Sequence, residues 1–142
     1  MSKSNTFEND CLKLWFNASP IAGLADNAAA APLTNLYVAL HTADPGEAGA
    51  QTATECTYAG YARAPVPRTA GAWTVTGSQV VPAANIDFPA ATGGSETATH
   101  FSIGTAATGA GKVLYKGPIT PTIAIATGVT PRLTTGTNVN ED

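Results

Sequence analysis

The sequence predicts a mostly β protein, an antiparallel β-sandwich or jelly-roll-like barrel with a short α-helix at the N-terminus. Apolar and polar residues alternate from Asn35 onward, beginning with Leu36, Val38 and Leu40 on one face. Turn residues interrupt this alternation at short intervals, and only residues 5–17 have helical periodicity. Short strands at this spacing are typical of an antiparallel sandwich or a jelly roll.

The predicted helix spans residues 5–17. Asn5 is expected to cap it, with Glu8 three residues later. One face is expected to contain Phe7, Cys11, Leu14 and Trp15, widened by Leu12 and Phe16. Such an aromatic helix is expected to dock either on its own domain or on a neighbouring subunit. Ser19-Pro20 ends the helix, and residues 21–32 read as a loop with room for one helical turn. We therefore expect a single domain, in which residues 1–34 form a helix and docking arm and residues 35–142 form the β-sandwich.

Further strands are predicted after the first one. Their ranges are 58–68, 72–76, 79–82, 85–89, 97–104, 112–118, 121–127 and 129–135. Turn chemistry separates them, for example at Asp44-Pro45-Gly46 and Thr127-Gly128. Several prolines lie within or beside these runs. Because proline cannot donate a backbone hydrogen bond, we expect many of them at sheet edges or strand ends.

Composition limits the function classes. The apolar share of 44% is dominated by alanine, so a single core is thin, and self-association into a homodimer or homotrimer is expected. Charged residues make up only 12%, which is typical of a surface that partners cover. Seven basic and ten acidic residues leave no basic stripe for phosphates, so direct binding of nucleic acid is not expected.

Neither a membrane segment nor a cysteine framework is predicted. No run of 18 apolar residues occurs, and the N-terminal segment is amphipathic rather than a signal-peptide core. We expect a chain that is made and kept in a cytoplasm and does not enter a membrane. Cys11 and Cys56 lack the spacing of a zinc site or a disulfide framework, and both are expected to be free thiols.

Three residue groups were weighed as sites of chemistry. The loop from Gly104 to Lys112 lacks the glycine and hydroxyl positions of a phosphate-binding loop and reads as a hairpin loop. Asp44, Glu47 and Glu55 lack the alternating spacing of a calcium loop. His41 and His100, with Asp87, Ser102 and Thr42 as conceivable companions, have no catalytic motif around them and read as structural. No catalytic residue, metal or cofactor is predicted.

Two groups of aromatic residues are candidates for protein contacts. Aromatic residues and arginine are enriched at binding hot spots. The candidates are Phe7, Trp15 and Phe16 on the helix, and Tyr58, Tyr61, Arg63 and Trp73 in the β region. The alternative is that Tyr58 and Tyr61 cover the sandwich edge while Arg63 pairs with an acid.

Several stretches are similar to a group of small tailed-bacteriophage proteins, labelled tail-fibre-like or head-decoration proteins. They are NLYVALHTADPGEAGA at 35–50, Gly60-Tyr61-Ala62-Arg63, Asn85-Ile86-Asp87-Phe88-Pro89 and Thr99-His100-Phe101-Ser102-Ile103-Gly104. The resemblance implies a virion structural protein, first of all a capsid cement or decoration protein. Such a protein would lie on the capsid exterior, bind across junctions of the major capsid protein and stabilise the mature head.

Two rivals to the cement role remain. One is a tail or tail-fibre-associated protein that takes part in binding a host receptor. The other is a surface polysaccharide hydrolase, which needs two carboxylates roughly 5–10 Å apart. Within the central β region only Asp87 and Glu96 supply acids, so the enzyme is disfavoured.

Overall fold

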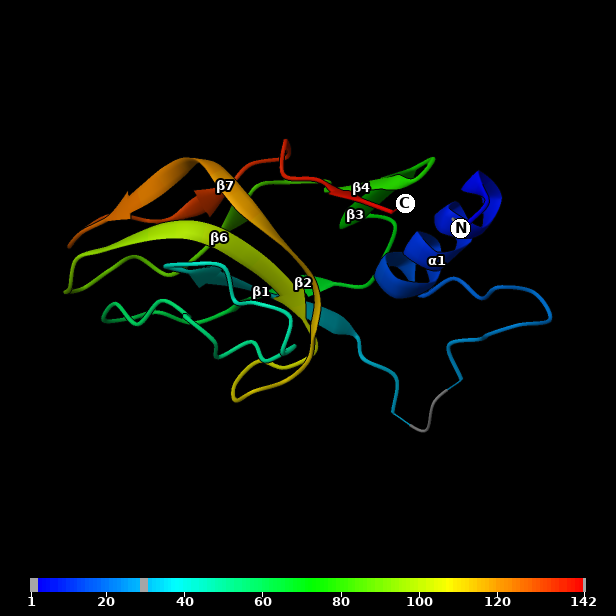
Figure 1. The fold of residues 1–142 in the computed structure, drawn as a ribbon, viewed down its shortest axis with the longest axis horizontal. Coiled ribbons are helices and arrows are strands. Elements are labelled where there is room, and N and C mark those ends of the chain that lie inside the picture. The colour runs from blue at the N-terminus through cyan, green and yellow to red at the C-terminus, as the bar shows by residue number, and fades with distance from the viewer. Residues whose placement is uncertain (1–2, 29–30, 142) are drawn as a thin grey trace. The chain divides into compact units, whose positions relative to one another are not determined.

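The computed structural model describes residues 3–28 and 31–141, which contain one helix and short strands (Figure 1). The helix is α1 (Asn5–Asn17), and the strands are β1 (Asn35–His41), β2 (Ala64–Pro67), β3 (Trp73–Thr76), β4 (Gln79–Pro82), β5 (Ile86–Asp87), β6 (Glu96–Gly104), β7 (Val113–Ile125), β8 (Arg132–Leu133) and β9 (Val139–Asn140). The sheet orders are β2-β1-β6-β7, β3-β4-β9 and β5-β8, and the pairs with a defined register are antiparallel. These described sheets do not close into a barrel. The predicted mostly-β, sandwich-like fold with an N-terminal helix is confirmed.

Contacts group the chain into two compact units. The first unit consists of Met1–Asn35, Pro67–Asn85 and Thr134–Asp142, and the second of Leu36–Val66 and Ile86–Leu133. Each unit is therefore built from segments that are distant in sequence. The expected division at residue 35, into an arm and one β domain, stays a prediction.

In the first unit, α1 packs on the hairpin β3–β4 (Figure 1). Phe16 meets Trp73 edge to face, with ring centroids 4.9 Å apart, and both side chains are buried. Leu12, one turn before Phe16, is also fully buried. Aromatic pairs of this geometry add to the stabilisation that comes from area burial alone. This contact fixes the side of the helix that faces the hairpin.

The bounds of the helix are as predicted, and four residues of its expected apolar face are buried, namely Cys11, Leu12, Leu14 and Phe16, whereas the predicted cap and the placement of Phe7 and Trp15 were wrong. The N-cap is Ser4, whose Oγ accepts from the backbone N–H of Phe7 at 3.4 Å, while Asn5 is already helical. Phe7 and Trp15 are 39% and 43% exposed instead of facing the core. The buried helix residues are Glu8, Cys11, Leu12, Leu14 and Phe16. The face is rotated because the hairpin packs along the side that carries Leu12 and Phe16.

In the second unit, β6 and β7 form a long antiparallel hairpin that curves (Figure 1). β1 pairs with the other side of β6, with Val38 opposite Ile103 and His41 opposite His100. The runs 112–118 and 121–127, predicted as two strands, form the single strand β7. The pairing register of β6 with β7 shifts between Ala98 and His100, so the two strands stay paired across the point where a break was predicted. The segment between β6 and β7 is a hairpin loop, as predicted.

The expected placement of prolines is confirmed in this sheet. The sheet order makes β2 and β7 its edge strands. Pro65 and Pro67 lie in β2, Pro118 and Pro121 lie in β7, and the inner strands contain none. Because an edge strand has one unpaired side, a missing N–H is tolerated there.

Other predicted strands are shorter than expected. The run 58–68 contains strand only from Ala64, because Tyr61 N–H bonds to the carbonyl of Tyr58 and Gly60 adopts a φ of 94° in a turn. The run 85–89 contributes only Ile86–Asp87, the run 129–135 only Arg132–Leu133, and β9 was not predicted. In the described part of the chain, no helix is long and apolar enough to cross a membrane.

Candidate functional site: the N-terminal apolar group

Exposed apolar side chains concentrate near the N-terminus. In the part of the chain that the structure describes, the large hydrophobic residues that remain exposed are Phe7, Trp15, Leu24 and Leu33. We call these four the N-terminal apolar group. All four belong to the first unit, two on α1 and two on the segment that follows it. Scattered exposed hydrophobic residues need no explanation, but their restriction to one part of the sequence makes this part a candidate for contact with a partner.

In the segment after the helix, residues 18–34, none of the residues that the structure describes has a buried side chain. Phe16 and Leu36 are buried, and none of the described residues between them is. We call residues 18–34 the arm. Its described residues include a single charged one, Asp26, whose carboxylate accepts from the N–H of Ala28 at 3.2 Å. An apolar arm without burial lacks the usual driving force for order, so its order has to come from polar contacts.

One source of order is a closed turn at Ile21–Ala25. The Ile21 N–H donates to the Ala25 carbonyl at 2.7 Å, and the Ala25 N–H donates back to Ile21 at 3.0 Å. Gly23 has a φ of 74°, a left-handed conformation that suits glycine. This turn presents Leu24 with 75% of its surface exposed.

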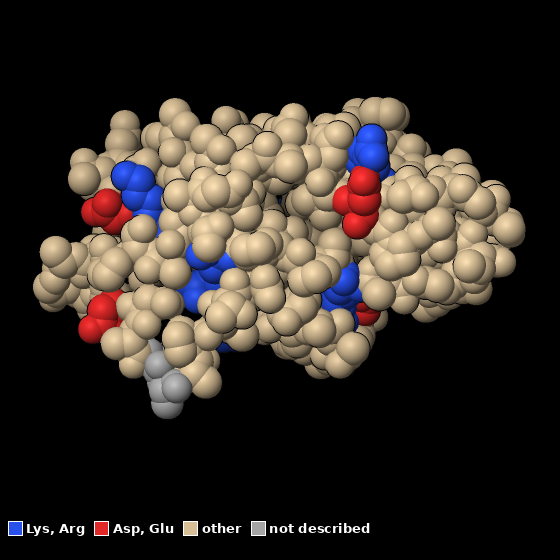
Figure 2. Space-filling model, turned by 180° about the vertical axis from the view of Figure 1, so that it is seen from behind, with Lys and Arg blue, Asp and Glu red and all other residues tan. Residues whose placement is uncertain are grey.

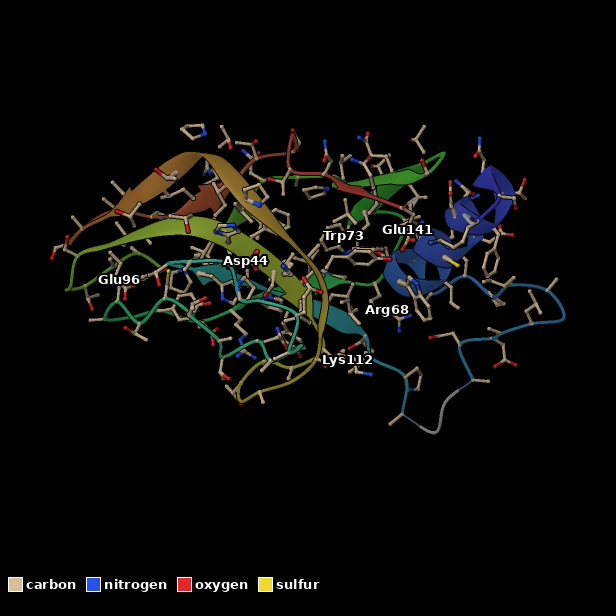
Figure 3. All side chains as sticks on the ribbon, in the orientation of Figure 1. Asp44, Arg68, Trp73, Glu96, Lys112 and Glu141 are labelled. Carbon is tan, nitrogen blue, oxygen red and sulfur yellow. The ribbon has the colours of Figure 1, made fainter. Side chains whose placement is uncertain are left out.

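Arg68 is the second source of order, and it closes the arm into a loop (Figure 3). Its guanidinium donates to the carbonyls of Leu14 at 2.8 Å, Trp15 at 2.7 Å and Leu33 at 2.8 Å, and to Asn27 Oδ1 at 3.2 Å. These four bonds reach the residues before the arm, its middle and its end. Burial lowers the pKa of Arg68.

The same contacts complete the helix C-terminus. The last turn of α1 contains no basic residue. Ala18 adopts the left-handed cap conformation, with a φ of 53°, and the Ser19 N–H bonds to the carbonyl of Lys13 at 3.1 Å. Arg68 supplies the positive charge that a helix C-terminus favours, from a position far along the sequence.

A second polar cluster lies in the second unit around Arg63. The Arg63 guanidinium forms a two-point ion pair with Glu55, at 2.7 and 2.8 Å, and donates to the carbonyls of Ala106 at 2.8 Å and Gly109 at 2.7 Å. Tyr61 donates its hydroxyl to Glu55 Oε1 at 2.9 Å, and burial raises the pKa of Tyr61. This cluster ties the β6–β7 loop to the rest of the unit.

His41 and Ser102 form a buried hydrogen-bonded pair in the second unit. His41 lies between the Ala53 carbonyl and Ser102 Oγ, each 2.8 Å from one ring nitrogen, and both His41 and Ser102 are fully buried. With Nδ1–H donating to the carbonyl, Nε2 accepts from Ser102. A serine without exposed surface cannot meet a substrate, so this pair is structural. Asp87 forms an ion pair with Arg132 and does not join the His41–Ser102 pair. The Thr42 hydroxyl donates a hydrogen bond to the Thr54 carbonyl.

The acids weighed as calcium ligands pair with cations. Lys116 Nζ lies 2.8 Å from Asp44 and 2.9 Å from Glu47, whereas Glu55 binds Arg63. The predicted turn at Asp44 is present, since the Gly46 N–H donates to its carboxylate at 2.8 Å. Among residues 3–28 and 31–141, no group of His, Cys, Asp and Glu is arranged to hold a metal ion.

Comparison with known families identifies the chain. A family described as Podophage GP4 fiber I protein gp80 matches residues 2–139. The chain belongs to this fibre I family. No curated protein matches the sequence. Membership confirms the resemblance to short-tailed phage proteins and makes the chain a structural, fibre-related protein of the phage virion.

In this fibre I protein, the seven predicted contact residues fall into three sets. Phe7 and Trp15 are exposed on α1, and Phe16 and Trp73 pack on each other inside the first unit. The third set is Tyr58, Tyr61 and Arg63 in the second unit, where the two tyrosine rings meet edge to face at 5.3 Å. Four of the seven residues are buried inside their own units, namely Phe16, Tyr58, Arg63 and Trp73. The interface role of the seven stays a prediction.

Sequence reasoning missed Leu24, Leu33 and Arg68. Leu24 stands between Gly23 and Asp26-Asn27, turn-forming residues that indicated a loop but not its exposed tip. Nothing in the sequence near Arg68 indicates its partners, which lie in α1 and the arm.

Proposed function

We propose that this fibre I protein attaches to the assembled virion through α1 and the arm and acts there as a static structural subunit. The observation that supports this proposal is the restriction of exposed large hydrophobic side chains, among the described residues, to α1 and the arm. Trp15 and Phe7 are residue types that dominate interface energetics when they become buried. In the attached state the partner covers these two side chains. The arm needs little further ordering on attachment, because Arg68 already holds it at Asn27 and Leu33.

The pairing of charged side chains within the protein supports an attachment that does not depend on charge. The face shown in Figure 2 carries few charged groups, and several blue and red groups adjoin one another. Lys116 pairs with Asp44 and Glu47, and Arg132 pairs with Asp87. Side chains already paired within the protein have little left to offer a partner. The described residues of the arm include one charged residue, Asp26, so we expect the proposed attachment to be mainly apolar and to weaken little at high salt.

Of the two locations in the virion, the tail is our first candidate. The matched family is described as a fibre protein of a podophage, and this description favours the tail. In this location the subunit takes part in fibre attachment or in contact with a host receptor. No catalytic step is part of the proposal.

The second candidate is the capsid cement role. Compact units of short strands, without a fibre-like sequence repeat, favour a globular subunit that binds across junctions of the major capsid protein on the capsid exterior. A partner that binds only the assembled shell at a hundred times its dissociation constant stabilises the shell by about 2.7 kcal/mol per site.

A cryo-EM reconstruction of the intact virion tests both the attachment and its location. Density for this subunit on the tail supports the first candidate, and density covering the head shell supports the second. A variant with Phe7→Ser and Trp15→Ser should be lost from virions, whereas Lys13→Ser, which alters another exposed residue of α1, should be retained. Absence of the wild-type protein from purified virions would refute the proposed function.

A further inference from the structure

We propose that His41 is an acid-sensitive switch, which opens the end of the 42–55 loop when its imidazole ring takes up a proton. The loop leaves β1 directly after His41 and returns at Glu55, which forms an antiparallel bridge with His41. We call residues 53–56 the return segment. All of these residues belong to the second unit, so the switch is separate from the attachment proposed for α1 and the arm.

The His41 ring fastens the return segment to the sheet. One ring nitrogen lies 2.8 Å from the Ala53 carbonyl, and the other lies 2.8 Å from Ser102 Oγ of β6. At the end of the segment, the Cys56 N–H donates to the Leu40 carbonyl of β1 at 2.9 Å. The ring is fully buried, so a change in its charge has to be met by the protein rather than by water.

Only a neutral ring suits both of its partners. The Ala53 carbonyl can only accept, so Nδ1 carries the hydrogen and Nε2 accepts from the Ser102 hydroxyl. When Nε2 also carries a hydrogen, that hydrogen points at the one that Ser102 donates. Ser102 then has to turn its hydroxyl hydrogen away from the ring, inside a site without exposed surface. A buried donor turned away from its acceptor is unfavourable, so protonation weakens the closed arrangement.

The carboxylate of the return segment is already in use. Both oxygens of Glu55 accept hydrogen bonds from Arg63, at 2.7 and 2.8 Å. Its charge is therefore largely matched before the ring is protonated. Burial lowers the pKa of His41, Arg63 and His100 act in the same direction, and the Ala53 carbonyl and Glu55 oppose them. A charged ring is thus unfavourable in this site.

Two further basic side chains come from β6 and β7. His100 of β6 lies opposite His41 in the register of the two strands. Lys116 of β7 pairs with Asp44 at 2.8 Å and with Glu47 at 2.9 Å. Both acids of the loop are therefore used by Lys116. These neighbours give an imidazolium no counter-charge that would keep the loop closed.

Opening is confined to the return segment, because the middle of the loop is held elsewhere. The Gln51 N–H donates to the Ala110 carbonyl at 2.6 Å, and the Gly49 carbonyl accepts from the Val113 N–H at 2.8 Å. Thr54, in contrast, has a φ of 53°, a left-handed conformation that is uncommon for a β-branched residue. Such a conformation persists only while its surroundings hold it. Loss of the His41 contact therefore releases the part of the loop that is least relaxed.

Two free thiols report on the opening. Cys56 closes the return segment, is 1% exposed, and has its pKa raised to about 12, chiefly by burial. Cys11 is also buried, but it lies on α1 in the first unit. Opening of the return segment should uncover Cys56 alone, whereas unfolding of the whole protein uncovers both thiols.

The test labels the thiols with dithiodipyridine, a disulfide that reacts with thiols at acidic as well as at neutral pH. Labelling of each cysteine is followed by mass spectrometry after digestion, and its rate is divided by that of free cysteine at the same pH. Between pH 7.5 and 5 the Cys56 rate should rise more than about tenfold, since a histidine outside the protein titrates near 6.5. The Cys11 rate should stay low. His41→Gln, whose amide donates and accepts without titrating, should abolish the rise.

Three results would overturn the inference. A flat Cys56 rate in the wild type would show that protonation does not open the segment. A parallel rise at Cys11 would show general unfolding instead of a local switch. An unchanged rise in His41→Gln would make another group the sensor. If His41→Gln labels both thiols rapidly at pH 7.5, it has not folded, and His41→Asn takes its place. The comparison of the two thiols in the wild type needs no variant.

Discussion

Arg68 Nη2 donates a hydrogen bond to the carbonyl oxygen of Leu14 at 2.8 Å, although the two residues lie on opposite sides of the arm in sequence. This bond, with those to Trp15 and Leu33, makes one guanidinium both the cap of α1 and the closure of the arm. The planar fork of an arginine serves several acceptors at once, which a lysine ammonium cannot reproduce in the same geometry.

Arg68→Lys should therefore destabilise the protein by about 2 kcal/mol, since hydrogen bonds from a charged group contribute about 1.5–3 kcal/mol each and lysine retains only part of them. Urea unfolding followed by tryptophan fluorescence measures this change, because Trp15 and Trp73 both belong to the first unit. Arg132→Lys is the matched control, since Arg132 is paired at an exposed position. Equal losses for the two variants would contradict the role given to Arg68.

Gly104→Ala should destabilise the second unit. A Cβ at this position would overlap the side-chain amide of Gln51, which is fully buried and accepts from the Ala106 N–H at 2.9 Å. Overpacking of this kind costs about 1–3 kcal/mol. At Gly71 the nearest atom to an added Cβ is Thr69 Oγ1 at 3.9 Å, so Gly71→Ala should be neutral or stabilise by about 0.4–1 kcal/mol. Thermal unfolding of both variants measures these changes in stability. An unchanged melting temperature for Gly104→Ala would contradict the prediction, since it would show that the Gln51 side chain can move aside.

Protein stability should fall as the pH drops below about 6.5. Burial lowers the pKa of His41 from its ordinary 6.5, so the folded protein keeps this ring neutral while the unfolded chain takes up a proton. Stability is therefore full above about pH 6.5 and decreases through the range between that value and the lowered pKa of the folded state.

Urea midpoints measured between about pH 5 and 7.5 show this slope, and His41→Gln should remove it. The pKa values of Asp44 and Asp87 are lowered by their bonds to Lys116 and Arg132, so these carboxyls act at more acidic pH, below about 3.9. A flat profile for wild type would mean that His41 accepts a proton in the folded state.

Glu55→Gln should be costly because it leaves a buried guanidinium without its counter-charge. Breaking a buried pair costs about 3–5 kcal/mol, and the side chain of Arg63 is only 3% exposed. Asp87→Asn removes the acid of an exposed arginine pair and should have little effect. Chemical denaturation of the two variants in parallel makes the comparison. Similar changes in both would contradict a buried ion pair at Arg63.

Local signals in the sequence predicted the elements whose causes are local. The bounds of the helix at residues 5–17 follow from its period and from Ser19-Pro20 beyond it, and the turn at Asp44 follows from its own carboxylate. The exposure of Phe7 and Trp15 on α1 did not follow, because residues of β3 and β4, far along the chain, decide which side of the helix is covered. For the same reason the two units, each built from separate segments, could not be read from the order of residues.

The candidate site was predicted in part, on residue type alone. Phe7 and Trp15 were chosen as aromatic residues of a helix, and the structure exposes them, but Phe16 and Trp73, chosen on the same residue types, are buried against each other. Exposure depends on tertiary contacts, which residue type does not specify. Leu24 was missed because a leucine in a loop is ordinary until the turn that projects it is known.

The prolines of β2 and β7 have a consequence for a protein that is concentrated in a particle. The four-stranded sheet ends on both sides in strands that carry two prolines each. An uninterrupted edge would let copies add strand by strand into open-ended fibrils, as in amyloid. With both edges interrupted by prolines, crowding alone should not start such growth.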